Sequence, residues 1–411
     1  VGAGYLISNE NFYKNSSLSK ILPKVKIKAT YGLVGNDQIG GTRFLYQSDI
    51  KLGGGMIPSL GLGQTIVQGL LANPDVTWET ATKQNFGIDM KLFKDFSLSF
   101  DYFIENRKDI LIARSSVPSF QGVPVGNIPR VNMGKIENKG YEVEATYSKV
   151  FNKDFSFIVK GNFAYNKNTQ KEMDEPQKSA EYAYRTRKTG YSVGQFFGYV
   201  RDFSNGNGYI NTEEELAELK YEIGAPSLGD FKYKDLNGDG VINDEAPIGY
   251  SSVPRITYGA SLAMNYKGFD FSVLFQGIGK VSGYYTQGFW ETPRQGAYVG
   301  FHKKAWTKER YANGEEILYP ALGTTQNTNH RLNDFFVMSR AFVRLKNIEL
   351  GYTLPKNSLK VIGIQTARIY VGGQNLFTWD KMRAEVADPE LSSATNYPIT
   401  RMINVGCNIT F

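Results

Sequence analysis

The sequence has 411 residues, with 47 Lys and Arg against 40 Asp and Glu, which gives a net charge of +7 at pH 7. One Cys and two His exclude a disulfide scaffold and a Cys- or His-rich metal centre. The mean hydropathy is −0.35, and no apolar run approaches the roughly 18 residues of a membrane-spanning helix. The 14% of aromatic residues and the 43 glycines indicate a large β protein rather than a disordered chain.

Strand-type alternation of apolar and polar residues recurs along the whole chain. Near the beginning, for example, Val25, Ile27 and Ala29 alternate with three lysines. Around Asn347 the alternation slips by one residue, which predicts a β-bulge. The pattern predicts ten strands, near 24–34, 77–92, 95–106, 139–150, 154–166, 255–266, 268–278, 340–354, 365–376 and 400–411. Residues 1–12 resemble the lower end of one more strand.

The lengths of these strands and of their connections point to a membrane barrel. Soluble strands cluster near five or six residues, whereas a tilted strand that crosses a bilayer needs about 9–11. Tight turns are predicted at 94–95, 152–153 and 267–268. Long loops are predicted near 35–76, 107–138, 167–254, 279–339 and 377–399. Short periplasmic turns and long extracellular loops are typical of antiparallel outer-membrane β-barrels.

Each predicted strand also has one apolar face and one polar face, as expected for a wide barrel with lipid outside and a polar lumen. The last strand alternates up to Phe411, the final residue. A terminal aromatic that closes an amphipathic strand resembles the C-terminal signal of outer-membrane barrels. The alternative is an ordinary edge strand that ends in Phe. We predict an all-β, antiparallel transmembrane barrel fold.

One loop segment has the opening pattern of a calcium-binding loop. Oxygen ligands at alternate positions, a glycine at position six and a backbone carbonyl at position seven converge on one ion. The candidate ligands are Asp235, Asn237, Asp239, Val241 and Asn243. Position twelve is Ala246 where a bidentate Glu is expected, so Asp244 or Glu245 would have to substitute. The alternative is an Asp- and Gly-rich turn without an ion.

Other loop residues are weaker candidates. Aromatic side chains in the long loops could stack on sugar rings or hold peptide side chains; they are Trp290, Trp306, Trp379, Tyr284, Tyr285 and Tyr298. A membrane-interface girdle is the alternative, and it is the favoured one for Trp78. Residues 213–220 predict a short, solvated helix.

The sequence contains no convincing catalytic motif. Ser17 and Lys20 have the spacing of a Ser–Lys pair, but they fall in a predicted turn. His302 and His330 have no evident nucleophile motif around them. The basic residues are spread along the chain, which argues against binding of nucleic acid. We therefore expect a protein that is not an enzyme.

Seven segments together resemble the SusC/RagA family of TonB-dependent outer-membrane transporters. In chain order they are 28–37 (KATYGLVGND), 78–89 (WETATKQNFGID), 132–144 (NMGKIENKGYEVE), 231–241 (FKYKDLNGDGV), 266–275 (YKGFDFSVLF), 344–355 (RLKNIELGYTLP) and 370–377 (YVGGQNLF). With the terminal Phe411, they extend the resemblance over nearly the whole chain.

The resemblance implies that residues 1–411 form the C-terminal part of a barrel of about 22 strands. It implies a plug domain and a TonB-contacting segment outside this chain, and a SusD-like surface lipoprotein over the extracellular loops. The expected function is import of oligosaccharides or peptides across the outer membrane of a Gram-negative bacterium, without bond chemistry. The alternatives are an autonomous small porin or adhesin, and a secreted soluble β protein.

Overall fold

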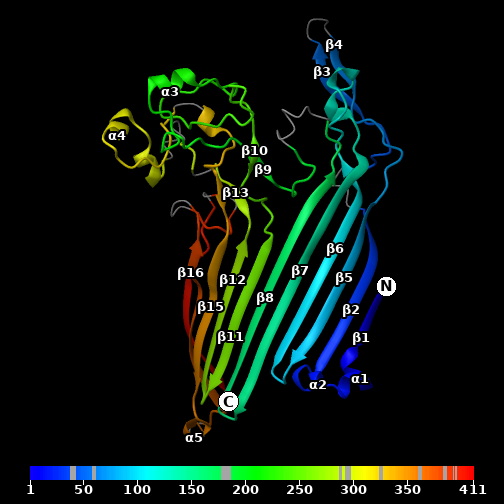
Figure 1. Ribbon diagram of the computed structural model, residues 1–411, viewed down its shortest axis with the longest axis vertical. Coiled ribbons are helices and arrows are strands. Elements are labelled where there is room, and N and C mark those ends of the chain that lie inside the picture. Colours follow the sequence, from blue (N-terminus) through cyan, green and yellow to red (C-terminus); the bar gives the residue numbers. More distant parts are fainter. Residues whose placement is uncertain are drawn as a thin grey trace.

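A computed structural model of the chain describes residues 1–37, 43–57, 62–176, 187–286, 289–291, 298–323, 327–359, 363–382, 387–391, 393 and 396–411. Its main feature is one antiparallel sheet of eleven strands that are neighbours in chain order (Figure 1). The strands are β1 (Gly2–Leu6), β2 (Lys24–Asn36), β5 (Glu79–Leu92), β6 (Phe96–Ile112), β7 (Val131–Asn152), β8 (Phe155–Glu172), β11 (Ile256–Tyr266), β12 (Phe269–Gly279), β15 (Phe342–Thr353), β16 (Thr366–Asp380) and β17 (Met402–Thr410). The sheet is open, with β1 and β17 at its edges.

The sheet contains all ten predicted strands, and β1 confirms that the first residues hold part of another. Several strands are longer than predicted. The connection predicted at 107–138 is shorter, because β6 continues to Ile112 and β7 begins at Val131. Both strand ends carry register shifts around the Ile110–Gly134 pair, and such irregularities interrupt the period-two pattern. Strand β8 likewise continues to Glu172 through a polar run without alternation.

The bulge predicted around Asn347 is confirmed. Leu345 pairs with Phe377, and Asn347 pairs with Gln374. Lys346 on β15 and two residues on β16 are therefore left outside the ladder. One of these two is Asn375, whose φ of 52° lies in the left-handed region. Asn is among the residues that tolerate this conformation.

Smaller elements lie in the connections. Three two-stranded sheets pair β3 (Ile50–Ile57) with β4 (Leu62–Gln68), β9 (Phe196–Gly198) with β10 (Ala246–Ile248), and β13 (Ser282–Tyr284) with β14 (Val337–Ser339). The short helices are α1 (Asn11–Lys14), α2 (Leu18–Ile21), α3 (Glu213–Glu218), α4 (Lys308–Ala312) and α5 (Lys356–Leu359), and the 3₁₀ turns are Ile7–Asn9, Ser119–Gln121, Val125–Asn127, Gly300–Lys304 and Thr328–His330.

Helix α3 confirms the helix predicted near 213–220, and the Thr212 side chain caps it by accepting the N–H of Glu215. The β3–β4 hairpin was not predicted, because its glycine-rich sequence lacks alternation. No helix within the described ranges is long and apolar enough to cross a membrane.

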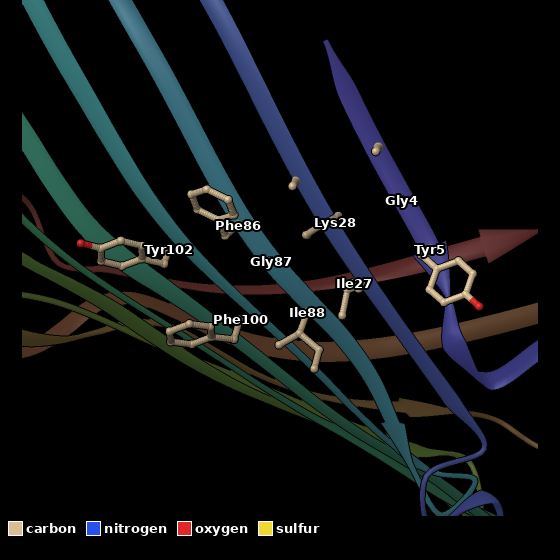
Figure 2. Close-up of a pocket in the computed structure, with 11 residues that line it drawn as sticks. Gly4, Tyr5, Ile27, Lys28, Phe86, Gly87, Ile88, Phe100 and Tyr102 are labelled. Carbon is tan, nitrogen blue, oxygen red and sulfur yellow. The ribbon is translucent and has the colours of Figure 1, made fainter. Parts of the chain in front are cut away.

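One face of the sheet is a continuous apolar surface. Tyr5, Ile27, Ile88 and Phe100 occupy adjacent register positions on four neighbouring strands, and Figure 2 shows them side by side. A shallow groove of about 490 Å³ runs along this row. Exposed aromatic and aliphatic side chains on one face are what a lipid-facing barrel wall requires.

Ion pairs across the strands cover the opposite, polar face. Lys28 on β2 pairs with Asp101 on β6 at 2.9 Å, although β5 lies between them. The intervening residue is Gly87, in register with both. A Cβ there would lie 2.2 Å from Lys28 Cε and 2.4 Å from Asp101 Oδ1. The missing side chain therefore leaves room for an ion pair between strands that are not neighbours.

The substitution Gly87→Val should lower the unfolding free energy by about 1–3 kcal/mol, because the new side chain displaces Lys28 from Asp101. The urea midpoint of the protein in detergent micelles measures this loss. Gly32→Val is the matched control, since no atom lies within 4 Å of a Cβ built at Gly32. Equal losses in the two variants would contradict the proposed role of Gly87.

Candidate binding region in the long loops

The loops that follow β8 and β12 pack together around one aromatic core at one end of the sheet (Figure 1). We call the described residues of 196–248 and 284–339 the loop cap. Its hydrophobic core cluster consists of Tyr199, Tyr209, Phe231, Tyr233, Ile242, Tyr285, Phe289, Ala305, Trp306, Tyr319, Phe335, Phe336 and Met338. Both loops contribute to this core, so burial of its aromatic side chains holds the two segments to each other.

A buried carboxylate joins the same two loops. Asp230 is 2% exposed and accepts hydrogen bonds from the N–H of Ser227 at 2.8 Å, from Asn329 Nδ2 at 2.7 Å and from Thr328 Oγ1 at 3.2 Å. The Asn329 side-chain oxygen accepts the N–H of Phe231 in return. Burial raises the pKa of Asp230, and these donors oppose the rise only in part. The carboxylate therefore links the loop after β8 to the loop after β12.

A second buried carboxylate, Glu291, accepts hydrogen bonds from the Tyr319 hydroxyl, from the N–H of Gly323 at 3.1 Å and from His330 Nε2 at 3.2 Å. Burial alone would raise the pKa of Glu291. The donors outweigh it and hold that pKa below its ordinary value. Burial lowers the pKa of the other histidine, His302, whose Nε2 lies 2.8 Å from the Phe289 carbonyl oxygen. Both histidines thus serve the packing of the loop cap.

A buried arginine holds the loop between β16 and β17 against the sheet. Arg344 on β15 is 1% exposed. Its Nη2 lies 2.7 Å from both carboxylate oxygens of Asp388, its Nη1 pairs with Glu390, and its Nε donates to Thr378 Oγ1 at 2.9 Å. Arg340 donates to two carbonyl oxygens of the same segment. Removing one partner of such a buried pair typically costs about 3–5 kcal/mol, so this segment is firmly attached.

Beside this anchor lies a polar cleft of about 590 Å³. Its walls come from the ends of β15 and β16, the attached segment and the residues before β17. They are formed by Arg344, Asn375, Thr378, Asp380, Met382, Ala387, Asp388, Pro389, Pro398, Ile399 and Arg401. Arg344 and Thr378 are register partners and belong to the polar face of the sheet. This volume is within the usual range of ligand pockets.

The predicted aromatic contacts are corrected in part. Tyr285 and Trp306 are 1% and 7% exposed, and Trp306 Nε1 donates to Asn211 Oδ1 at 3.0 Å. They belong to the core of the loop cap, so neither stacking on a ligand nor a membrane girdle describes them. Tyr284 and Trp290 are half-buried against this core. Only Tyr298 and Trp379 are exposed, at 51% and 54%.

The predicted calcium segment forms a compact turn on the loop cap. Asp235 accepts the N–H groups of Gly238 at 2.7 Å and Gly240 at 2.8 Å. These bonds hold its pKa below the ordinary value, although slight burial opposes them. Asn243 Oδ1 is buried without a hydrogen-bond partner. Across the described ranges, no group of three or more His, Cys, Asp and Glu side chains is arranged to hold a metal ion. Binding would therefore depend on the amide and carbonyl oxygens in addition to the two Asp side chains, and the calcium site stays a prediction.

The substitution Glu291→Gln should destabilise the loop cap by about 1–3 kcal/mol at pH 7, because the ionised carboxylate accepts three hydrogen bonds. A lowered pKa means that this contribution is present above the ordinary pKa of Glu and is lost as the pH falls through the folded-state value. The difference from the wild type should therefore shrink below about pH 4.

The fluorescence of Trp290, whose ring centroid lies 4.7 Å from that of His330, reports on this region during urea unfolding. Glu218→Gln on the exposed side of α3 is the control that removes one carboxylate from the surface. A loss in Glu291→Gln that is constant from pH 7 to pH 3 would contradict the assignment.

Comparisons with known proteins show which family has this sequence pattern and fold. The family model described as TonB dependent receptor-like, beta-barrel, matches residues 8–376. TonB-dependent receptor P3 of Formosa agariphila is 29% identical over 438 residues, which covers 98% of this chain and 41% of the receptor. TonB-dependent receptor SusC of Bacteroides thetaiotaomicron is 23% identical and covers 99% of this chain and 39% of SusC. The chain thus spans about two-fifths of the length of these relatives.

A solved structure, that of the RagAB peptide transporter, has a TM-score of 0.72 at 21% identity. The superposition covers 100% of this chain and 43% of that chain, and at this identity it shows the fold alone. The family model confirms the predicted resemblance. The chain belongs to the TonB-dependent receptor β-barrel family of outer-membrane proteins in Gram-negative bacteria.

Proposed function

We propose that the protein to which this chain belongs imports oligosaccharides or peptides across the outer membrane, driven through TonB. The observation that carries this proposal is the long-stranded sheet with an apolar face, a polar face of ion pairs and a folded loop cap at one end. Family membership supports it. So do the relatives named SusC and, at the level of fold, the RagAB peptide transporter.

In this proposal the open sheet is closed by the rest of the same transporter. The outer edges of β1 and β17 carry backbone groups that the described sheet leaves without a ladder partner. Each unpaired N–H or C=O costs several kcal/mol in hydrocarbon, so a spanning sheet must close. The relatives have the length for this closure, because the chain covers only 39–41% of them. The bilayer then covers the apolar face, and the polar face lines the path.

The loop cap would face the cell exterior and meet a SusD-like surface lipoprotein, which captures the solute. TonB would act on a plug domain elsewhere in the transporter. The chain itself would do no bond chemistry. In support, Asp230 and Glu291, two of the buried carboxylates of the loop cap, are occupied by structural hydrogen bonds.

Uptake by cells is the test of this function. Cells that express the complete transporter should accumulate labelled oligosaccharides or peptides, and should lose this uptake when TonB is deleted or the proton gradient is collapsed. A lipoprotein should co-purify in mild detergent. Uptake that persists without TonB would instead indicate a passive porin. A surface protein that takes up no solute would indicate an adhesin.

We also propose that the turn at Asp235–Asn243 binds Ca²⁺ and that the ion stiffens this part of the loop cap. Asp235, Asn237, Asp239, the Val241 carbonyl and Asn243 would hold the ion. The unpartnered Asn243 oxygen favours this assignment. Hard oxygen ligands at alternating positions are the donor set that Ca²⁺ prefers.

Calorimetry of the chelator-treated, complete transporter should show heat on addition of Ca²⁺, and the double substitution Asp235→Asn and Asp239→Asn should abolish it. The matched control is Glu213→Gln with Glu214→Gln, which removes two exposed carboxylates from nearby helix α3. No heat with the wild-type protein, or equal heat with both double variants, would contradict the site.

A further inference from the structure

We propose that the cleft lined by the ends of β15 and β16 and by the residues before β17 binds a solute that carries a carboxylate, with Arg401 pairing the carboxylate and Asn375 Oδ1 accepting a hydrogen bond from an adjacent hydroxyl or amide N–H. This inference rests on the proposed import function and names a chemical class of solute. The two residues are brought together by strand register. The ladder ends where Gln374 pairs with Met402, and Asn375 and Arg401, the next residue on either side, both line the cleft.

The first argument is the unused acceptor on Asn375. Its Oδ1 is buried and has no hydrogen-bond partner, whereas its Nδ2 donates to the Thr400 carbonyl oxygen at 3.3 Å. A buried acceptor without a donor is costly, and native structures contain few of them. Asn375 also holds a φ of 52° at the double bulge opposite Lys346. Non-glycine residues held in this conformation cluster at ligand sites. A solute that donates to Oδ1 would satisfy the orphaned oxygen.

The second argument is the distribution of charge in the cleft. The buried Arg344 is neutralised by Asp388 and Glu390, so it has no positive charge to offer a ligand. Arg401 is exposed in the same lining, and no ion pair joins it to another residue in the described ranges. A guanidinium group with its five N–H donors matches a carboxylate in a bidentate arrangement. Among the described residues of the lining, Arg401 is therefore the cation available to the solute.

The remaining lining narrows the class of solute. Asp380 is exposed and accepts the N–H of Met382 at 2.8 Å, which leaves further acceptor capacity on its carboxylate. It therefore favours solutes rich in O–H or N–H donors and opposes those with several negative charges. Pro389, Pro398 and Ile399 add apolar walls. A uronic-acid sugar and the C-terminus of a peptide both carry one carboxylate on a molecule with many O–H or N–H donors. The cleft volume of about 590 Å³ suits a short oligomer of either.

Binding of matched solutes to the complete transporter, measured calorimetrically in detergent, tests this inference. The probes are an aldotriouronic acid, which carries one uronic-acid carboxylate on a neutral disaccharide, against its methyl ester, and N-acetyl-tetra-alanine against its C-terminal amide. In at least one pair, the free carboxylate should bind about tenfold or more tightly than the neutral form, which corresponds to one charged hydrogen-bonded contact. The pair that shows the difference identifies the source of the carboxylate.

Variants then assign the contact. Arg401→Gln should remove the preference for the carboxylate, and Arg401→Lys should retain only part of it, because an ammonium lacks the planar fork. Asn375→Gly keeps the left-handed backbone available and removes the orphaned oxygen, so it should weaken both members of the preferred pair. Lys381→Gln is the control, since it removes one exposed positive charge next to Asp380 without touching the lining.

The outcomes separate this inference from the proposed function. A wild-type transporter that imports solutes but binds the acid and neutral probes equally would overturn the carboxylate site and leave import intact. The same holds if Arg401→Gln and Lys381→Gln reduce binding alike, because the effect would then come from general charge. A transporter with TonB-dependent uptake of neither sugars nor peptides would instead overturn the proposed function.

Discussion

The structure depends on one constraint: a backbone N–H or C=O group inside a bilayer must be hydrogen-bonded to another part of the protein. An antiparallel sheet whose strands are neighbours in chain order meets this demand with few connecting residues, because each strand pairs with the one before it. The eleven strands follow this order without a crossover. The same constraint explains why the alternation in the sequence is so regular. Only a period of two keeps every apolar side chain on the lipid face while the backbone stays in the ladder.

Outside the bilayer the constraint is relaxed, and a different principle organises the chain. The loops are long enough to bury apolar side chains of their own, so they form a second core of the kind found in soluble domains. The two regions are joined by β13–β14 pairing and by Arg344, which belongs to a barrel strand but is buried by a loop. A buried arginine is tolerated there because Asp388 and Glu390 both pair with it. The same residue, Arg344, thus belongs to a strand of the sheet and lines the cleft.

The sequence predicted the sheet well, because period-two alternation is a direct consequence of lipid on one side. It even located the bulge at Asn347, since a bulge shifts that period by one residue. It did not predict the β3–β4 hairpin, because the glycine-rich sequence there shows no alternation of apolar and polar residues. It misplaced Trp306 and Tyr285, because an aromatic side chain in a loop has the same local sequence signature whether it is exposed or buried. Only contacts between distant segments decide that question. The ion pair of Arg344 could not be predicted from local patterns for the same reason, since its partner Asp388 is 44 residues away in the chain.

Charged residues have different roles on the polar face of the sheet and in the core of the loop cap. On the polar face, several charges are paired across the strands, as Lys28 is with Asp101 over Gly87. Exposed pairs of this kind contribute little free energy, and in the proposed importer each paired charge would attract a solute less than an unpaired one. In the core of the loop cap, the buried carboxylates Asp230 and Glu291 are held by several hydrogen bonds, so they fix the shape of the loops rather than bind solutes. In the proposed importer, we place selectivity at the junction of the two regions, where the bulge at Asn375 interrupts the ladder. There the buried Asn375 Oδ1 has no hydrogen-bond partner in the described structure, and in the proposed site a solute would supply the missing donor.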